Sequence, residues 1–507
     1  MERLSYEFMK KDFNDQLQGS EQLPVKVLQV GEGNFMRGFF DWMIDHMNRQ
    51  GLFNGRIVAV QPTPHGRKLP DLQAQDNAYT VLLRGQLDGQ IVDRADIITA
   101  ISDSMNPYEE WEKVVATACE PTLEIFASNT TEAGLTYQKE EWNPDASPLS
   151  FPGKVAQLLY ERYKAFDGAA DKGLIFLPCE LVERNGDVLK DIVLQKIEDW
   201  SLGETFKTWV LEHNEFCQTL VDRIVTGYPA NIEEFQTRLG YEDRLLTVAE
   251  PYHLFVIEGG ERASSVLPFQ DAGLNVAYAP VQDYAELKIR LLNAPHTMVF
   301  ALAYLYGKDS VYDSMRNHDI RAFLEGAMDQ AIKPVLPYEK EEKSHFAAGV
   351  LERFENPYQR HLLTDLGQNA IQKFETRVLP LWKRWENDGV ARHYFALALA
   401  SILVYYQPTE KNQEKVEGRA LNRVMPLRES EQTITFMYDC WEQNHLENIT
   451  VFELVAQCLD NDDIWQEPII VDDEQRQWIA DYVSDFLEIG AQKTVQQFNA
   501  KMKEEVQ

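Results

Sequence analysis

The sequence has 507 residues, of which 44% are hydrophobic and 26% are charged, and this composition excludes a disordered or collagen-like chain. Lysine and arginine together number 49 and aspartate and glutamate 81, which gives a formal net charge of −32. Such a surface repels phosphate backbones and anionic lipids, so we expect neither nucleic acid nor a membrane among the partners.

The cysteine pattern and the N-terminus indicate a reducing compartment. The five cysteines are far apart and form no C-x-x-C pair, which argues against a disulfide framework or a zinc site. Residues 1–19 contain no apolar run of the signal-peptide kind. The longest apolar stretch, 395–406, falls well short of the roughly 20 residues that span a bilayer, and we read it as a buried helix. We therefore expect a cytoplasmic protein.

Short apolar runs alternate with helical segments in the first half of the chain. These runs predict strands at 25–30, 56–61, 123–128 and 173–177, with a helix at 34–49 after the first strand. Residues 79–84 and 90–99 predict a hairpin around Gly85 and Gly89. Continuously apolar strands that alternate with helices indicate a parallel sheet covered on both faces.

The pattern changes at about residue 283, where helical spacing replaces the apolar runs. The last segment of β type is 276–279, so we place a domain boundary near residue 280. The sequence thus predicts an α/β domain with a mostly parallel sheet at 1–280 and a mainly α-helical domain at 281–507.

A glycine-containing turn joins the first expected strand to the first expected helix. In QVGEGNFMRG (29–38), Gly31 permits a tight turn and Gly33 lets the backbone approach a pyrophosphate on the helix N-terminus. The third small position of the G-x-G-x-x-G pattern is Met36, so a plain strand–helix turn is the alternative. The place of the turn in the first strand–helix–strand unit favours a Rossmann-type, dinucleotide-binding domain.

The second expected strand does not end in the acid that usually binds the adenosine ribose. Gln61 stands there instead, and its amide can bond a ribose hydroxyl, whereas Arg67 and Lys68 suit a 2′-phosphate. The residues alone leave NAD and NADP both open.

Two groups of residues compete for the chemistry. Tyr160 and Lys164 have the Y-x-x-x-K spacing of short-chain dehydrogenases, but the glycine turn lacks the spacing of that class. Lys288, Asn293 and His296 fit within one arc of an otherwise apolar helix, at about 100° per residue. Such an arc predicts a site, with a helix bearing one polar edge as the alternative. A desolvated lysine can exchange a proton with an alcohol, and neutral amides can stabilise an oxyanion without a metal.

Several strings resemble the polyol-specific long-chain dehydrogenases, the family of mannitol dehydrogenase. The K-x-x-x-x-N-x-x-H signature of that family is matched by Lys288, Asn293 and His296. The likeness continues across most of the chain, in GEGNFMRGFFDWMID (31–45), SNTTEAG (128–134), PCELVERNG (178–186), DRIVTGYP (222–229) and LKIRLLNAPH (287–296). The resemblance implies an NAD-dependent, metal-independent enzyme that interconverts D-tagaturonate and D-altronate, a hexuronate and an aldonate, in galacturonate breakdown. The epimeric fructuronate is the alternative substrate, and a catalytically idle NAD-binding sensor is the alternative of another class.

The resemblance also implies roles for individual residues. Lys288 would be the general acid/base, Asn293 and Asn185 would form an oxyanion hole, and His296 would hold the substrate. The residues expected to bind the cofactor are Gly31, Gly33, Asn34, Phe35, Asn129 and Thr130, with Gln61 at the ribose.

A uronate carries a carboxylate, which a protein of charge −32 can hold only with a local cation. Lys373 and Arg377 are four residues apart on an expected helix, so both can face one carboxylate. Arg353 and His361 lie in the same stretch of sequence. We expect these four residues to bind the substrate, with a solvated surface as the alternative.

Overall fold

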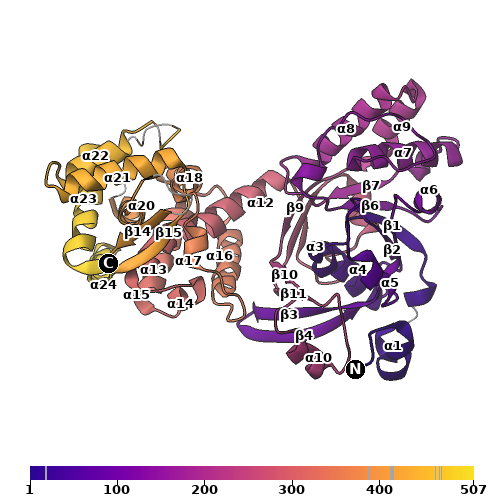
Figure 1. The fold of residues 1–507 in the computed structure, drawn as a ribbon, viewed down its shortest axis with the longest axis horizontal. Coiled ribbons are helices and arrows are strands. Elements are labelled where there is room, and N and C mark those ends of the chain that lie inside the picture. The colour runs from indigo at the N-terminus through magenta and orange to yellow at the C-terminus, as the bar shows by residue number, and fades with distance from the viewer. Residues whose placement is uncertain are drawn as a thin grey trace. The chain divides into compact units, whose positions relative to one another are not determined.

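The computed structural model describes residues 1–17, 20–385, 389–411, 416–462, 464–466, 469 and 471–506. The chain folds into two compact units, Met1–Tyr284 and Ala285–Gln507 (Figure 1). All five cysteines are free thiols. Within the described residues, no helix combines the length and the apolar character that a bilayer crossing requires.

The first unit is built on a six-stranded sheet in which all neighbouring strands are parallel. In spatial order the strands are β5 (Ile101–Met105), β2 (Arg56–Val60), β1 (Val25–Val30), β6 (Ile125–Ser128), β7 (Ile175–Pro178) and β8 (Glu215–Phe216). Counted along this sheet, the order is 3-2-1-4-5-6, the doubly wound Rossmann arrangement. The predicted α/β fold is confirmed.

Alternate side chains of the strands pack on opposite faces of the sheet. Val27 and Ile125 face one helical layer, whereas Leu28 and Phe126 face the other. The first layer contains α3 (Asn34–Gly38) and α4 (Phe40–Arg49), and the second contains α6 (Trp111–Ala118), α7 (Phe151–Ala165), α8 (Asn185–Asp199) and α9 (Glu204–His213). Because both faces are covered, the strands are apolar on both sides, as the sequence predicted.

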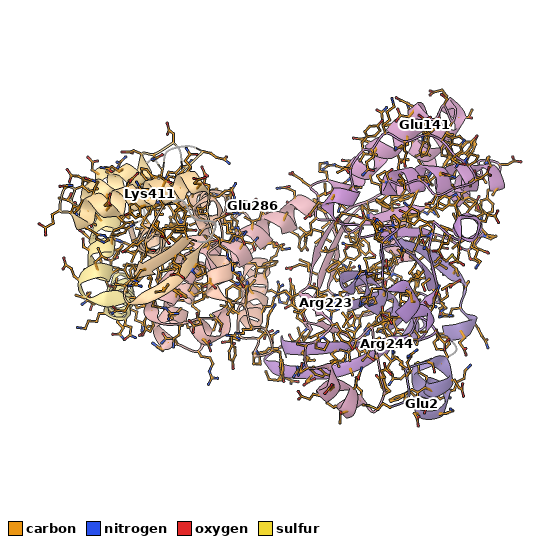
Figure 2. The ribbon with its side chains drawn as sticks, viewed as in Figure 1. Glu2, Glu141, Arg223, Arg244, Glu286 and Lys411 are labelled. Carbon is orange, nitrogen blue, oxygen red and sulfur yellow. The ribbon has the colours of Figure 1, made fainter. Side chains whose placement is uncertain are left out.

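The helix expected at 34–49 is broken at Phe39, where φ is −130° and ψ is −83°. The cause lies far away in the sequence. The Gly38 carbonyl accepts a hydrogen bond from Arg223 Nη1 at 2.8 Å, and a Cβ on Gly38 would lie 2.9 Å from a methyl group of Val225. Arg223 is labelled in Figure 2. Its buried guanidinium also lies over the Trp42 ring, 4.3 Å from the ring centroid.

Two smaller sheets complete the first unit. One has the order β10 (Val225–Gly227), β11 (Thr247–Ala249), β3 (Tyr79–Leu87), β4 (Gln90–Ile98), and the other β13 (Val276–Tyr278), β12 (Leu254–Glu258), β9 (Gln218–Asp222). The predicted hairpin is β3–β4, and its turn residues Asp88 and Gly89 both have positive φ, as a type I′ turn requires. The first unit also contains α1 (Tyr6–Asp12), α2 (Asn14–Leu17), α5 (Leu69–Gln73), α10 (Ile232–Leu239) and α11 (Glu261–Val266), and α12 (Val281–Leu287) begins in the first unit and ends in the second.

The second unit is mainly helical, as predicted. Its centre is the pair α13 (Ala294–Tyr306) and α20 (Gly389–Tyr405); α13 is buried along its whole length, and the apolar stretch 395–406 is buried as expected. Around this pair lie α14 (Val311–Met315), α15 (His318–Gly326), α16 (Lys340–Phe354), α17 (Leu363–Leu366), α18 (Ala370–Arg377), α19 (Leu379–Trp382), α21 (Glu431–His445), α22 (Val451–Leu459), α23 (Asp473–Glu488) and α24 (Gly490–Val506). One hairpin, β14 (Val416–Ala420) with β15 (Arg423–Leu427), interrupts the helices.

Candidate active site

The glycine turn lies at the switch point of the parallel sheet, between β1 and β6. Gly31 follows β1 with φ +113°, and its N–H donates to the Val60 carbonyl at 2.9 Å. A Cβ on Gly31 would lie 2.6 Å from the Asn129 carbonyl oxygen, so only glycine fits. Gly33 and Asn34 are exposed, and a Cβ on Gly33 would meet no atom within 4 Å. This open backbone leaves the room that a dinucleotide pyrophosphate needs.

A buried arginine supports the turn. The Arg37 guanidinium is 1% exposed and donates to the Glu32 carbonyl and, at 2.7 Å, to Asn34 Oδ1. Near it the Asp41 carboxyl accepts from the Tyr79 hydroxyl at 3.0 Å, and burial raises the pKa of Asp41 to about 7. Arg37 therefore fixes both the backbone of the turn and the first side chain of α3.

The segment after β6 lies beside the glycine turn. The Asn129 N–H donates to the Val30 carbonyl of β1 at 3.0 Å, and the Asn129 side-chain amide donates to the Cys179 carbonyl at 2.7 Å. The Thr130 N–H and hydroxyl both donate to the Glu180 carboxylate, at 2.8 and 3.0 Å. The structure thus brings Asn129 and Thr130 to the switch point, the edge where doubly wound sheets bind ligands.

Two other predicted cofactor residues, Phe35 and Gln61, follow β1 and β2, and the side chain of each contacts a neighbouring residue. Phe35 is half-buried, and its ring stacks on Phe39 at 4.9 Å. Gln61 is only 2% exposed, and its Nε2 donates to the Thr63 carbonyl at 2.6 Å. The Gln61 amide therefore shapes its own loop, and in this conformation its Nε2 is not available for a ribose.

Asn185 begins α8 and is 1% exposed. Its Nδ2 lies 2.9–3.2 Å from the carbonyls of Pro178, Glu180 and Thr219. Its Oδ1 accepts from the N–H groups of Gly186 and Thr219, both at 2.9 Å. These bonds occupy every donor and acceptor of the amide, so Asn185 ties the end of β7 to β9. Its role in an oxyanion hole stays a prediction, and it requires one of these bonds to be exchanged for substrate.

The predicted residues of the second unit lie on a π-helical turn. The turn η4 (Lys288–Asn293) joins α12 to α13, and the Ala294 N–H donates to the Ile289 carbonyl five residues back. Pro295 follows in α13 and has no N–H, so the α-helical ladder is interrupted here in any case. The expectation of α-helical spacing, at about 100° per residue, is wrong for Lys288–Asn293. The i→i+5 pattern brings Lys288 and Asn293 closer to one side of the helix, and such turns are frequent at functional sites.

His296 is 8% exposed, whereas Lys288 and Asn293 are half-buried, so the lysine expected to be desolvated keeps partial contact with solvent. The His296 ring bonds the Leu292 carbonyl, and Nε2 has no partner among the described residues. Burial, reinforced by nearby cations, holds the pKa of His296 well below its usual range. Because a carbonyl only accepts, the proton of the neutral ring lies on Nδ1, and Nε2 is left as a buried acceptor.

The four basic residues predicted to bind a carboxylate gather near His296. The rings of His296 and His361 lie 5.0 Å apart. Burial is the main cause that lowers the pKa of both imidazoles. The positive charges of Arg353 and Arg377 lower the pKa of His296 further, and those of Lys373 and Arg353 lower that of His361. Burial, followed by the charge of Arg377, lowers the pKa of Lys373. The four side chains, which come from one stretch of sequence, therefore form an electropositive cluster beside His296 on α13.

Arg290 is a site residue that the sequence analysis missed. Its Nη1 donates to the carbonyls of Thr376 and Arg377, at 2.9 and 2.7 Å, which ties α18 to the π-turn. Arg377 Nη1 in turn lies 3.5 Å from Thr297 Oγ1 on α13. A charged residue within an otherwise apolar helical segment was the available signal.

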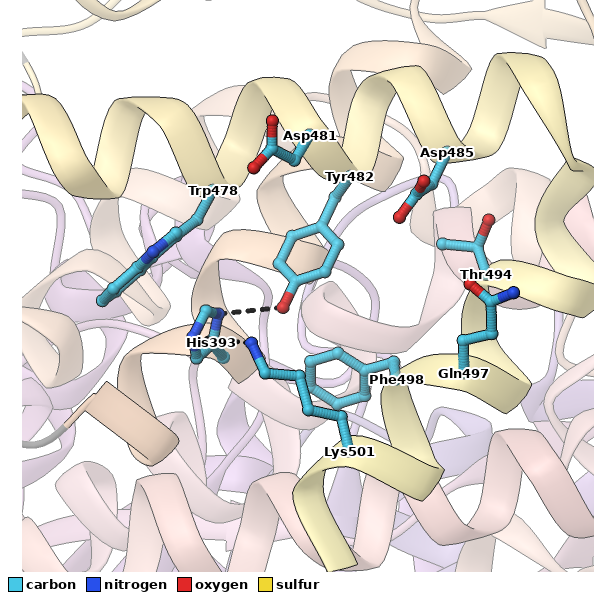
Figure 3. Close-up of a pocket in the computed structure, with 9 residues that line it drawn as sticks. All are labelled: His393, Trp478, Asp481, Tyr482, Asp485, Thr494, Gln497, Phe498 and Lys501. Carbon is cyan, nitrogen blue, oxygen red and sulfur yellow. Dashed lines mark hydrogen bonds between the residues drawn. The ribbon is translucent and has the colours of Figure 1, made fainter. Parts of the chain in front are cut away.

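A cavity of about 250 Å³ lies between α20, α23 and α24 (Figure 3). Its His393 is bonded at Nδ1 to the Tyr482 hydroxyl, at 2.8 Å, and at Nε2 to Lys501 Nζ, at 3.4 Å. Burial and the charge of Lys501 lower the pKa of His393 to about 4. None of the predicted site residues lines this cavity. Across the described residues, no group of three or more His, Cys, Asp or Glu side chains is arranged to hold a metal ion.

A doubly wound sheet with a glycine turn at its switch point, followed by a helical unit, defines a two-domain protein of the dinucleotide-binding Rossmann class. The family models agree in both parts of the chain. The mannitol dehydrogenase Rossmann domain matches residues 25–268, and the mannitol dehydrogenase C-terminal domain matches residues 280–482. The chain belongs to the mannitol dehydrogenase family.

Curated relatives share much of the sequence. An altronate oxidoreductase of Halalkalibacterium halodurans is 44% identical over 480 residues, covering 94% of this chain and 93% of that protein. An altronate oxidoreductase of Bacillus subtilis is 35% identical, covering 94% and 96%. Among solved structures, a D-sorbitol dehydrogenase has a TM-score of 0.74 at 19% identity, covering 94% of this chain and 96% of that one. Mannitol 2-dehydrogenase of Pseudomonas fluorescens, solved with NAD and D-mannitol, has a TM-score of 0.61 at 20% identity, covering 95% and 96%. These structures share the fold.

Proposed function

We propose that the protein is an NAD-dependent oxidoreductase that interconverts D-tagaturonate and D-altronate. The observation that carries this proposal is the cluster of Arg353, His361, Lys373 and Arg377 beside His296, whose Nε2 has no hydrogen-bond partner in the described part of the chain. A polyol offers hydroxyls only, whereas a uronate adds a carboxylate that such a cluster can hold. The altronate oxidoreductase relatives support the same substrate class.

The residues fit a dinucleotide and a keto-acid without a metal. Gly33 and Asn34 would hold the pyrophosphate, and Asn129 and Thr130 the nicotinamide end; NADH supplies the hydride when bound. As the keto carbon is reduced, the Lys288 ammonium gives a proton to the new alkoxide oxygen, and the lysine takes back a proton from solvent. The reverse transfers oxidise altronate.

Two further side chains hold the substrate in this scheme. The Asn293 amide donates to the carbonyl oxygen as it gains charge. The neutral His296 accepts a hydrogen bond from a substrate hydroxyl at Nε2, since that nitrogen carries no proton. His296 therefore positions the sugar chain, and the cations hold its carboxylate.

Initial rates with a substrate panel test the proposal. We expect NADH oxidation with tagaturonate to exceed that with fructuronate and with the uncharged tagatose, to be unaffected by a chelator, and to be more efficient than NADPH oxidation. No turnover of any keto-uronate would refute the function, and equal or better efficiency with NADPH would refute the cofactor preference.

The carboxylate site is tested by Lys373→Met and Arg377→Met. A charge-assisted hydrogen bond contributes roughly 1.5–3 kcal/mol, so the KM for tagaturonate should rise by about 10- to 150-fold, and the preference over tagatose should narrow. Lys493→Met, an exposed position on α24, is the matched control. If both variants discriminate uronate from ketose as well as wild type does, these two residues do not hold the carboxylate, and Arg353 is the next to change.

A further inference from the structure

Glu180 is a buried acid whose carboxylate faces the segment after the neighbouring strand. It lies just past the end of β7 and is 2% exposed. Oε1 accepts from the Thr130 N–H at 2.8 Å and from the Thr130 hydroxyl at 3.0 Å, and Oε2 accepts from the Ser128 hydroxyl at 3.1 Å. One carboxylate thus gathers three donors from the end of β6 and the residues that follow it.

The backbone of Glu180 holds a second segment. Its carbonyl accepts from Asn185 Nδ2 at 3.1 Å, and the adjoining Cys179 carbonyl accepts from Asn129 Nδ2 at 2.7 Å. The turn after β7 therefore contacts both Asn129 and Asn185, two residues predicted to lie at the cofactor and the substrate. Glu180 stands between them as a common support.

The segment that Glu180 holds is conformationally unfavourable on its own. Thr131 has φ +71° and ψ 165°, a region that β-branched residues rarely adopt. The Thr130 N–H, directly before it, is the group that the carboxylate binds. A backbone in this conformation persists only where its surroundings hold it, and the Glu180 hydrogen bonds supply that restraint.

The opposing cost is the burial of an acid. Burial raises the pKa of Glu180, and the favourable influences on its carboxylate are hydrogen bonds rather than a neighbouring cation. A buried carboxylate is tolerated when such donors satisfy it. The Glu180 carboxylate is therefore a specific acceptor for the three donors of Ser128 and Thr130.

We propose that Glu180 is a positioning residue that holds Ser128–Thr130 in the conformation that binds the nicotinamide half of the cofactor. This inference rests on the proposed function, because it assumes a nicotinamide dinucleotide at the switch point. Glu180 itself acts through Thr130 and Asn129 and does not touch the cofactor in this scheme. The glycine turn, which supports the pyrophosphate, is held by Arg37 instead. The two halves of the cofactor therefore depend on different buried side chains.

The test compares NADH with ADP-ribose, which lacks the nicotinamide. In Glu180→Ala we expect the Kd for NADH to rise about tenfold or more and the Kd for ADP-ribose to change less than about twofold. Glu180→Gln keeps an oxygen acceptor for Thr130, so it should restore NADH affinity to within about threefold of wild type. Glu183→Gln, at an exposed position of the same turn, is the matched control and should bind both ligands normally.

The outcomes separate the two proposals. If wild-type protein binds neither NADH nor ADP-ribose, the proposed function fails. If wild type binds NADH but Glu180→Ala weakens the binding of NADH and ADP-ribose equally, or weakens the binding of neither, the positioning role is overturned. If Glu180→Ala does not fold, Ser128→Ala removes one of the three contacts, and it should still weaken NADH more than ADP-ribose; an equal effect on both ligands overturns the inference.

Discussion

Gly31 and Gly33 lie two residues apart at the switch point, but only Gly33 has room for a Cβ atom. A Cβ on Gly31 would lie 2.6 Å from the Asn129 carbonyl oxygen and 3.2 Å from its carbon. The backbone segments at Gly31 and Asn129 cannot easily move apart to relieve this contact. The Gly31 N–H is hydrogen-bonded to the Val60 carbonyl, and the Asn129 N–H is hydrogen-bonded to the Val30 carbonyl. Gly31→Ala would also place an alanine at φ +113°, which L-residues rarely adopt.

The cost of Gly31→Ala has two parts. An unfavourable backbone conformation costs about 1–3 kcal/mol and overpacking against fixed atoms about 1–3 kcal/mol more. We expect a loss of about 2–6 kcal/mol in the free energy of unfolding, which should lower the Tm of the first unit by roughly 5–15 °C. Thermal unfolding followed by calorimetry measures this directly.

Gly33→Ala is the control for the same chemical change. Gly33 has φ −68°, and a Cβ there would meet no atom within 4 Å, so the Tm should stay within about 2 °C of wild type. The added methyl would project into the space where the backbone approaches a pyrophosphate, so NADH affinity should fall about tenfold or more. A Gly31→Ala protein that melts like wild type would refute the reasoning, and so would a Gly33→Ala protein that binds NADH normally.

Two further changes test the chemistry and the support of the turn. Lys288→Ala should lower kcat by about 10²–10⁴-fold while NADH still binds, and a Lys288→Ala enzyme with kcat within tenfold of wild type would contradict the assignment. Tyr160→Phe should change kcat little, because the Tyr160 ring packs against Phe206, with 5.1 Å between the ring centroids. Burial raises the pKa of Asp41 from its usual 3.8 to about 7, so between about pH 4 and 7 the folded protein binds the extra proton and stability falls as pH rises. Asp41→Asn should remove up to about 1.4 kcal/mol per pH unit of that slope in urea unfolding, and unchanged slopes in wild type and variant would show that Asp41 does not titrate there.

The elements that the sequence predicts well are those whose signals are local. The strand 25–30 is an apolar run between Pro24 and Gly31, and it matches β1. The break at Phe39 has no local signal, because it depends on Arg223 and Val225, which the fold brings to Gly38. Hydrophobic periodicity likewise does not distinguish a π-turn of six residues from the α-helices on either side of it.

Some features of the candidate site are likewise visible in the sequence, and others depend on the fold. The spacing of Lys288, Asn293 and His296 is visible in the sequence, whereas the inward bond of the Gln61 amide depends on how its loop closes. Glu180 belongs to PCELVERNG (178–186), in which the resemblance points only to Asn185. The proposed role of Glu180 follows from the adjacency of β6 and β7 in the sheet. Strand neighbours are a property of topology, and a single sequence does not state them.

The direction of Lys288 around the helix axis depends on the number of residues in the π-turn. A π-turn holds one residue more than the α-helical turn it replaces, so deleting the exposed Ile289 would bring α12 and α13 into one α-helical register, with the hydrogen-bond ladder still interrupted at Pro295. The buried side chains of α13 would keep their places, but Lys288 would swing by about 100° around the axis relative to them. The position of Lys288 relative to Asn293 and His296 therefore depends on one extra backbone residue, and its removal would turn the proposed proton donor away from the other two polar side chains.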